Sequence, residues 1–295
     1  MSIYQPGAIK RERRTKARQQ QLDAQILDVL RQDHPQSVRH VFYRMTDPRL
    51  PEPVEKSDRG YRQVQHRVTE LRRSGALPYG WITDATRRGH FVNTFGGASD
   101  FIRRMSGLYR ADLWRDSAFH VEVWAESRSI AGVIEADCRD LAVSLYPCGG
   151  FSSITLAYEA AQHINSVVSE QGKYPVIFYI GDYDPAGVLI DKALENELRE
   201  HLDCEVEFLR IAITEKQIAD YDLPVKPRKE TDRRSLHVSG AVEAEAMPAS
   251  VMRELVRWHV EAHLPAHALE VAKVAEESEQ SFLRRLAANL AESAP

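Results

Sequence analysis

The chain has 295 residues, 43% of them hydrophobic and 28% charged, with a formal net charge of -4 at pH 7. This composition is typical of a globular protein and excludes a disordered one, and the length favours two domains. No apolar run of about 18 residues or secretory signal is evident, and the three cysteines are too few for a disulfide framework or a zinc site. We therefore expect a cytoplasmic protein with no membrane partner.

The charge is distributed unevenly along the chain. Residues 1–119 carry 22 Lys and Arg against 13 Asp and Glu, whereas the remaining residues carry 17 against 30. A basic first part and an acidic second part favour a division of labour, in which one part binds a polyanion and the other binds metal. Ordinary variation of surface charge is the alternative.

The first part of the chain predicts three helices followed by two short strands. Apolar residues recur at helical spacing over residues 8–32 and over residues 58–74. Between them, Ser37 is a suitable N-cap for a second, short helix. The extended segments 79–83 and 90–95 flank a polar turn. This order is that of a winged helix-turn-helix, so we expect residues 1–117 to form a domain that binds double-stranded DNA.

Basic side chains lie on the exposed face of the predicted third helix and in the N-terminal segment. Such a helix commonly enters a DNA groove, where arginine and lysine neutralise phosphates. An ordinary solvated helix face is the alternative. The candidate DNA-binding residues are Lys10, Arg14, Arg62, Arg67, Arg72 and Arg73.

From residue 118 onwards, apolar strands alternate with helices. Strands are predicted over 119–126, 141–146, 175–184 and 206–213, and two final helices over about 248–263 and 265–291. This alternation predicts an α/β fold with a mostly parallel sheet covered on both faces, formed by residues 118–295. In such sheets ligands bind beyond the carboxyl ends of the strands.

Three carboxylates follow predicted strands in this second part. Glu126 ends one strand, and Asp182 and Asp184 come just after another, at a spacing that points both aspartates the same way. Carboxylates held together need a cation, and oxygen ligands select Mg²⁺ or Mn²⁺. We therefore expect a Mg²⁺ site at Glu126, Asp182 and Asp184, with Glu126 as a third ligand or an acid–base group.

Together with Glu126, the segment Asp182-Tyr183-Asp184-Pro185-Ala186-Gly187 resembles the TOPRIM domain of topoisomerases, primases and some nucleases. Its D-x-D-P-x-G form is similar to the A subunit of DNA topoisomerase VI and its meiotic double-strand-break relatives. Those proteins carry a winged helix in front of the TOPRIM domain, with a tyrosine in a motif close to S-x-R-x-L-Y-Y. The segment Ser37–Tyr43 reads SVRHVFY here, so the chain resembles a reduced form of that subunit, with Ser127 where a lysine often follows the glutamate.

The resemblance implies a chemistry and a set of partners. Tyr43 would attack a DNA phosphorus and become joined to the 5′ end, with Arg39 near the scissile phosphate and metal at the carboxylates. In the family the tyrosine and the metal come from different protomers, which implies a homodimer associated with the nucleoid. No nucleotide-binding loop is evident, so strand passage driven by ATP implies a separate ATPase subunit.

Three readings remain open from the sequence. The first is a tyrosine transesterase of the topoisomerase VI A type. The second is a TOPRIM nuclease that uses metal-activated water, with Phe42 and Tyr43 as core aromatics. The third is a DNA-binding maintenance protein without catalysis. The late segment Val242–Met247, VEAEAM, resembles an acidic segment of the family, but its residues alone assign it no chemistry.

Overall fold

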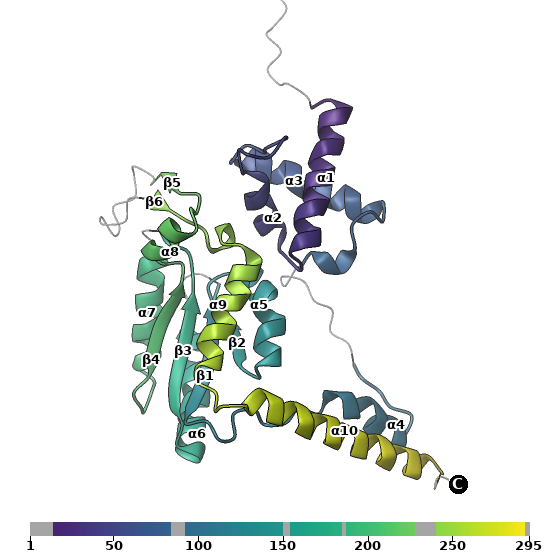
Figure 1. Cartoon of the computed structure of the whole chain (residues 1–295). Helices are drawn as coiled ribbons and strands as arrows, with labels where there is room; N and C mark the ends of the chain where they lie inside the picture. The colour runs from purple at the N-terminus through teal and green to yellow at the C-terminus, as the bar shows by residue number, and fades with distance from the viewer. Residues whose placement is uncertain (1–13, 84–91, 150–153, 185–186, 228–239, 293–295) are drawn as a thin grey trace, which may run out of the picture. The chain divides into compact units, whose positions relative to one another are not determined.

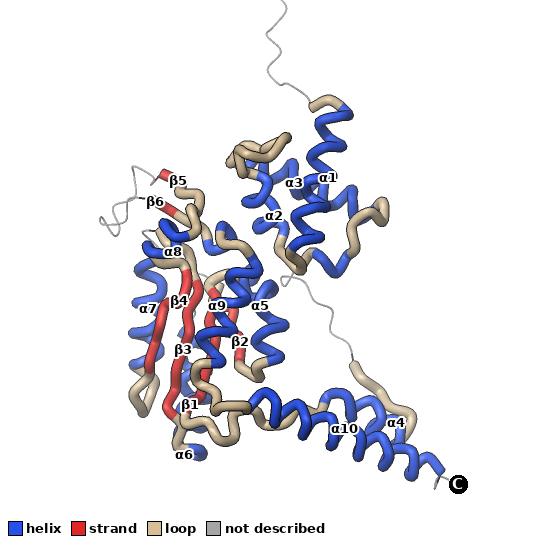
Figure 2. Tube along the Cα trace, in the orientation of Figure 1, coloured by secondary structure: helices blue, strands red, loops and turns tan. Residues whose placement is uncertain are grey.

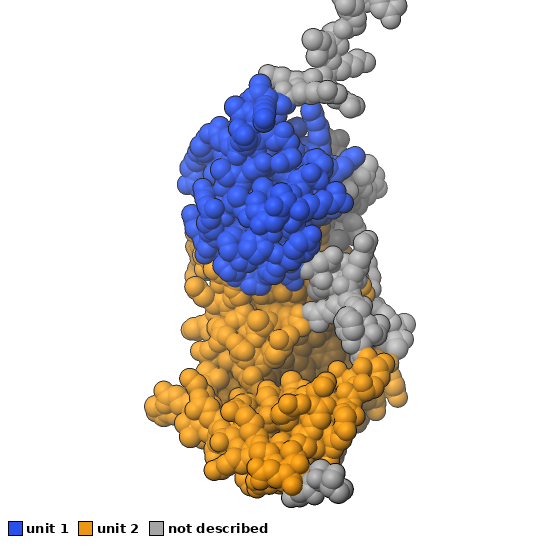
Figure 3. Space-filling view, turned by 90° about the vertical axis from the view of Figure 1, so that its right-hand side faces the viewer, with its two compact units in different colours: residues 1–83 blue, residues 84–295 orange. Residues whose placement is uncertain are grey.

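The computed structural model describes residues 14–83, 92–149, 154–184, 187–227 and 240–292. The chain forms two compact units, Met1–Thr83 and Asp84–Pro295, and each is described by itself (Figure 3). The division falls earlier than the boundary expected after residue 117. Residues 98–105 account for the difference, because they pack on a helix of the second unit.

The first unit is a cluster of three helices (Figure 1). Their bounds are α1 Lys16–Gln32, α2 Val38–Met45 and α3 Asp58–Arg73. Each helix begins after a hydroxyl side chain that accepts from a backbone N–H of the first turn, and Ser37 caps α2 as the sequence predicts. The described part of the first helix starts at Lys16, because Arg14 and Thr15 are not helical.

The hydrophobic core of this unit lies between the three helices. Leu22, Ile26 and Leu30 of α1 and Val64 and Val68 of α3 are buried, at the spacing of a single helix face. Within the described residues, the three helices predicted in this part of the chain are confirmed.

The predicted wing has no counterpart among the described residues. Tyr79–Trp81 is a 3-10 helix, and Ile82 makes one isolated parallel bridge to Gln36 instead of belonging to a strand. Residues 84–91, which include the predicted turn, lie outside the described residues, and residues 92–94 are not in a strand. What the structure shows of this unit is three helices and a short turn.

The second unit contains a parallel four-stranded sheet, in agreement with the predicted α/β class (Figure 2). The strand order is β2-β1-β3-β4, with all neighbours parallel. The strands are β1 Phe119–Ala125, β2 Ser144–Pro147, β3 Tyr174–Ile180 and β4 Glu207–Ala212. The helices that cover or follow it are α5 Arg128–Asp140, α6 Ile154–Gln171, α7 Gly187–Arg199, α8 Glu215–Asp220 and α9 Ala249–Glu261.

Helices pack on both faces of this sheet. Trp124, Ile177 and Tyr179 share a core cluster with buried residues of α6 and α7. Phe178, which points to the opposite face, contacts the rings of His259 in α9 and of His263 just after that helix. Because both faces are covered, β3 at the centre of the sheet is apolar and almost wholly buried, and the carboxyl ends of β1 and β3 meet at the edge where ligands bind in such sheets.

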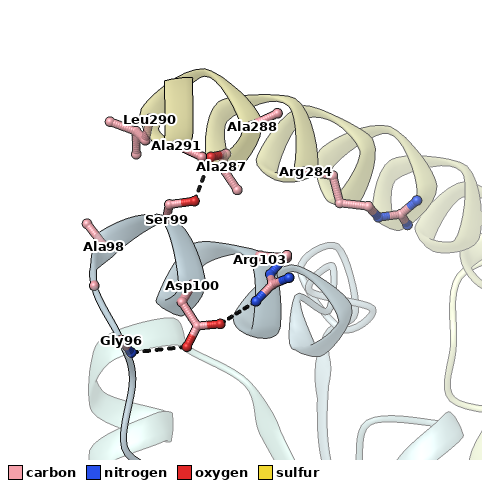
Figure 4. Close-up of a pocket in the computed structure, with 11 residues that line it drawn as sticks. Gly96, Ala98, Ser99, Asp100, Arg103, Arg284, Ala287, Ala288, Leu290 and Ala291 are labelled. Carbon is pink, nitrogen blue, oxygen red and sulfur yellow. Dashed lines mark hydrogen bonds and ion pairs between the residues drawn. The ribbon is translucent and has the colours of Figure 1, made fainter. Parts of the chain in front are cut away.

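The rest of the unit is a small hairpin and a helical pair. The hairpin joins β5 Lys226–Pro227 to β6 Gly240–Ala241, and a 3-10 helix, η3, follows at Ala244–Ala246. Helix α4, Ala98–Met105, and the 3-10 helix η2, Ser106–Leu108, pack along α10, Ala268–Glu292, where Ser99 Oγ donates to the carbonyl of Ala287 (Figure 4). No helix in the described ranges is long and apolar enough to cross a membrane.

Candidate metal centre

The sheet brings Glu126 and Asp182 together. Ala125 and Ile180 are paired in the register of β1 and β3, so the residues that follow them leave the sheet side by side. The backbone N–H of Asp182 donates to Oε2 of Glu126 over 3.0 Å, and the Tyr179 hydroxyl donates to the same oxygen over 3.4 Å. The predicted meeting of these two strand ends is therefore confirmed.

Two glycines let the chain turn tightly at this point. A β-carbon on Gly181 would lie 2.6 Å from Oε2 of Glu126, and one on Gly187 would lie 2.3 Å from the carbonyl oxygen of Asp182. Asp184 closes the turn by accepting from the N–H of Gly187 over 2.5 Å. The final glycine of the D-x-D-P-x-G segment is therefore required for steric reasons, and Gly181 lies just before that segment; Pro185 lies outside the described residues.

A third segment, which follows Val242, adds two acidic residues, Glu243 and Glu245, to which the sequence alone assigned no chemistry. Tyr183 and Val242 form an antiparallel bridge, which places the segment after Val242 beside Asp182. The N–H of Ala244 donates to Oδ1 of Asp182 over 2.8 Å. Glu245 is only 5% exposed and accepts from the hydroxyl of Ser127, the residue after Glu126, over 3.1 Å.

The electrostatics of this group favour a bound cation. Burial raises the pKa of Asp182 to about 8, and the charge of Glu245 is the next largest cause. Glu126 and Glu243 contribute in the same direction. Burial also raises the pKa of Glu126, against the opposing effects of the Asp182 N–H and the Arg210 charge. Carboxylates whose charged forms are this unfavourable without a counter-ion are a suitable set of ligands for a divalent cation.

The guanidinium of Arg210 on β4 binds the backbone of the turn that follows β3. Its Nη1 donates to the carbonyls of Gly181 and Asp182 over 3.0 and 3.1 Å. Its Nη2 donates to the carbonyl of Gly187 over 2.8 Å. Nε is paired with Asp191 at 2.6 Å, so the guanidinium fixes the backbone and leaves the Asp182 carboxylate for other partners.

The predicted nucleophile, Tyr43, is buried in the first unit together with Phe42. Tyr43 is 4% exposed and Phe42 3%, and the ring of Tyr43 lies below the ammonium of Lys56 at 5.6 Å. The guanidinium of Arg39 lies over the ring of Tyr61, 5.0 Å from its centroid. In this conformation Tyr43 is packed as a core aromatic and is not accessible to a DNA phosphate.

The candidate DNA-binding residues fall into two groups. Arg62 and Arg73 are exposed on α3, whereas Arg67 is bound through two 2.7 Å hydrogen bonds to Asp23 of α1. Arg72 stacks on the ring of Tyr79 and donates to its carbonyl.

Arg14 is also engaged within the unit. Its side chain is paired with Glu52 at 2.5 Å and is 18% exposed, and Lys10 lies outside the described residues. The expectation that Arg14 and Arg67 belong to an exposed DNA-binding surface is therefore corrected. Arg14, Arg67 and Arg72 make contacts inside the first unit, whereas Arg62 and Arg73 are exposed, Arg73 in an exposed pair with Glu70 at 3.3 Å.

Comparisons with known proteins add nothing to this geometry. No protein-family model, no curated protein and no solved structure matches the chain.

Proposed function

We propose that this protein cleaves DNA strands in a Mg²⁺-dependent reaction at the carboxylates that follow β1 and β3. The observation that carries the proposal is the convergence of Glu126, Asp182 and Glu245 at one end of a parallel sheet, where the pKa of Asp182 is raised to about 8. The resemblance to the TOPRIM domain of topoisomerase VI A subunits supplies the substrate class.

Asp182, Asp184 and Glu126 would hold the ion, and Mn²⁺ would fit the same oxygen ligands. A divalent ion there supplies charge neutralisation for a phosphate in the transition state. The chain's own contribution is positional. Arg210 and the two glycines fix the turn that carries Asp182, and Ser127 holds Glu245 at its edge.

In the leading form of this proposal Tyr43 is the nucleophile. Its hydroxyl oxygen bonds to phosphorus, the 3′ oxygen leaves as a hydroxyl, and the 5′ end stays on the protein as a phosphotyrosine. Since Tyr43 is buried, the first unit would have to expose it when it binds double-stranded DNA. The family pattern adds a homodimer in which each site is shared, and a separate ATPase partner for strand passage.

A second candidate function is hydrolysis by a metal-activated water, with Tyr43 as a core residue. The observation that favours it is the 4% exposure of Tyr43. Both candidates need the same carboxylates, so they differ only in the nucleophile. A covalent protein–DNA adduct that survives denaturation separates them.

The proposal is tested with the purified chain, supercoiled plasmid and Mg²⁺, with gel analysis before and after protease treatment. The expected result is broken DNA with the parent and none with Asp182→Asn. The matched control is Asp203→Asn, which changes an exposed carboxylate of the same unit. If Tyr43→Phe abolishes both cutting and adduct, the tyrosine is the nucleophile; if it cuts like the parent, water is. Mg²⁺-dependent cutting that persists in Asp182→Asn would contradict the proposal in both forms.

A further inference from the structure

A second group of potential metal ligands lies on β1, nearer its start and apart from the carboxylates that follow it. His120 and Glu122 are two residues apart on the strand and point to the same face of the sheet, and His163 of α6 lies above them. One ligand atom from each of the three residues lies within 4.8 Å of the others. The rings of His120 and His163 meet edge to face, 5.6 Å apart.

The carboxylate at the centre of this group is unusual for its burial. The Glu122 side chain is fully buried, in a strand whose neighbours are apolar. A carboxylate in such a place needs a positive partner or strong hydrogen bonds. Its Oε2 accepts from Nε1 of Trp124 over 2.8 Å, and its Oε1 faces Nε2 of His120 at 3.0 Å. The tryptophan thus holds one oxygen and directs the other towards the two histidines.

An ion from the solvent could reach this group of ligands through its exposed member, His163. Glu122 is fully buried and the His120 side chain is 16% exposed, whereas His163 is exposed. The fixed pair would therefore be completed by an exposed side chain that is able to change rotamer. In a tetrahedral zinc site with ligands at about 2.0–2.2 Å, neighbouring ligand atoms are roughly 3.4 Å apart, so His163 has to approach by about 1.4 Å at most.

We propose that His120, Glu122 and His163 form a Zn²⁺ site that is separate from the Mg²⁺ site. Two imidazoles and one carboxylate are ligands typical of zinc, whereas Mg²⁺ prefers oxygen alone. Trp124 acts as the outer partner that orients the carboxylate. Three protein ligands leave a fourth position for water or an external ligand, and the ion joins α6 to β1.

The test uses the full chain without a histidine tag, stripped with a chelator and kept in excess Mg²⁺ to saturate oxygen-only sites. Zn²⁺ is titrated against a chromophoric competitor. We expect one Zn²⁺ per chain, and His163→Ala should lower the affinity at least about tenfold, since even outer partners of a metal commonly contribute that much. Because His163 is exposed, this variant should fold normally, and circular dichroism checks that it does.

Three variants serve as controls. His66→Ala removes an exposed histidine from α3, and Gln162→Ala alters the exposed neighbour of His163 on α6; both should bind Zn²⁺ like the parent. Asp182→Asn should also keep the Zn²⁺ equivalent, so failure at this site and failure at the Mg²⁺ site are distinguishable. Unchanged affinity in His163→Ala, or no Zn²⁺ bound by the parent, would overturn the proposal and leave His120 and Glu122 as a structural pair.

Discussion

The backbone N–H of Asp182 donates to the carboxylate of Glu126 over 3.0 Å, so the ends of β3 and β1 are joined directly at the candidate metal centre. This contact forces the two acidic side chains into one small volume. Burial is the largest cause of the raised pKa of both carboxyls; the charges of Glu245 and Glu126 raise the pKa of Asp182 further, and the charge of Asp184 raises that of Glu126.

The stability of the metal-free protein should fall as the pH rises from about 4 to about 8. The pKa of Asp182 is about 8 in the folded chain against an ordinary value of 3.8, so the folded state binds more protons than the unfolded state in that window. Mg²⁺ binds the ionised form, and it should therefore raise the melting temperature more at pH 8.5 than at pH 6.

The gain at pH 8.5 should reach about 2.7 kcal/mol when Mg²⁺ is at 100 times its dissociation constant. Thermal unfolding with and without Mg²⁺ at the two pH values measures it, with Asp182→Asn as the control that should show little pH dependence. An equal or larger gain at pH 6 would count against Asp182 as a metal ligand.

Replacing Glu245 by glutamine should have two opposite effects. The metal-free protein should become more stable near pH 8, since Glu245 is the largest charged cause of the raised pKa of Asp182. The Mg²⁺ concentration that half-saturates cleavage should rise by about 10–100-fold. Glu254→Gln, which changes an exposed glutamate of α9, is the matched control. The same Mg²⁺ requirement in Glu245→Gln and the parent would exclude Glu245 from the site.

Replacing Gly187 by alanine should strongly reduce cleavage. The new β-carbon would lie 2.3 Å from the carbonyl of Asp182, so the turn that carries the aspartates has to move. Gly107→Ala is the control, because a β-carbon there meets nothing within 4 Å. Plasmid cleavage and circular dichroism, measured together, separate a displaced turn from an unfolded chain. Full activity in Gly187→Ala would show that the position of Asp182 does not matter.

The arginines of α3 should separate into two classes. Arg67→Ala breaks a paired contact to Asp23 in which both side chains are less than a fifth exposed, so it should lower the stability of the first unit. Arg62→Ala with Arg73→Ala should leave stability unchanged, weaken DNA binding and flatten its salt dependence, because fewer counterions are released. The DNA affinities of the parent and the double variant, measured at several salt concentrations, test this prediction. Unchanged binding in the double variant would mean that α3 does not contact DNA.

The parallel sheet and the meeting of Glu126 with Asp182 could be predicted from the sequence, whereas the position of Glu245 could not. Strand ends in a parallel sheet meet at one edge, so Glu126 and Asp182 were predictable as neighbours. Glu245 was not, because it is brought in by a bridge between Tyr183 and Val242, and the local pattern contains no information on that pairing. A charged Arg210 between apolar neighbours of a strand was the available signal for a positioning residue.

In the first unit, one prediction made from helical periodicity was wrong. Helical periodicity correctly placed Val64 and Val68 inside, but it assigned Arg67 to a free basic face. Its partner Asp23 lies 44 residues earlier, on another helix, and nothing in the periodicity of α3 points to it. Long-range ion pairs depend on the packing of the helices, which sequence spacing alone does not determine.

The central claim is that Asp182 contacts the ion that supports DNA cleavage, and a metal-specificity switch tests it most directly. Asp182→Cys exchanges an oxygen ligand for a sulfur ligand, which binds Mg²⁺ poorly and softer ions well. We expect this variant to bind DNA like the parent, to cut no DNA in Mg²⁺, and to regain cleavage in Cd²⁺. Undiminished cleavage by Asp182→Cys in Mg²⁺ would contradict the account.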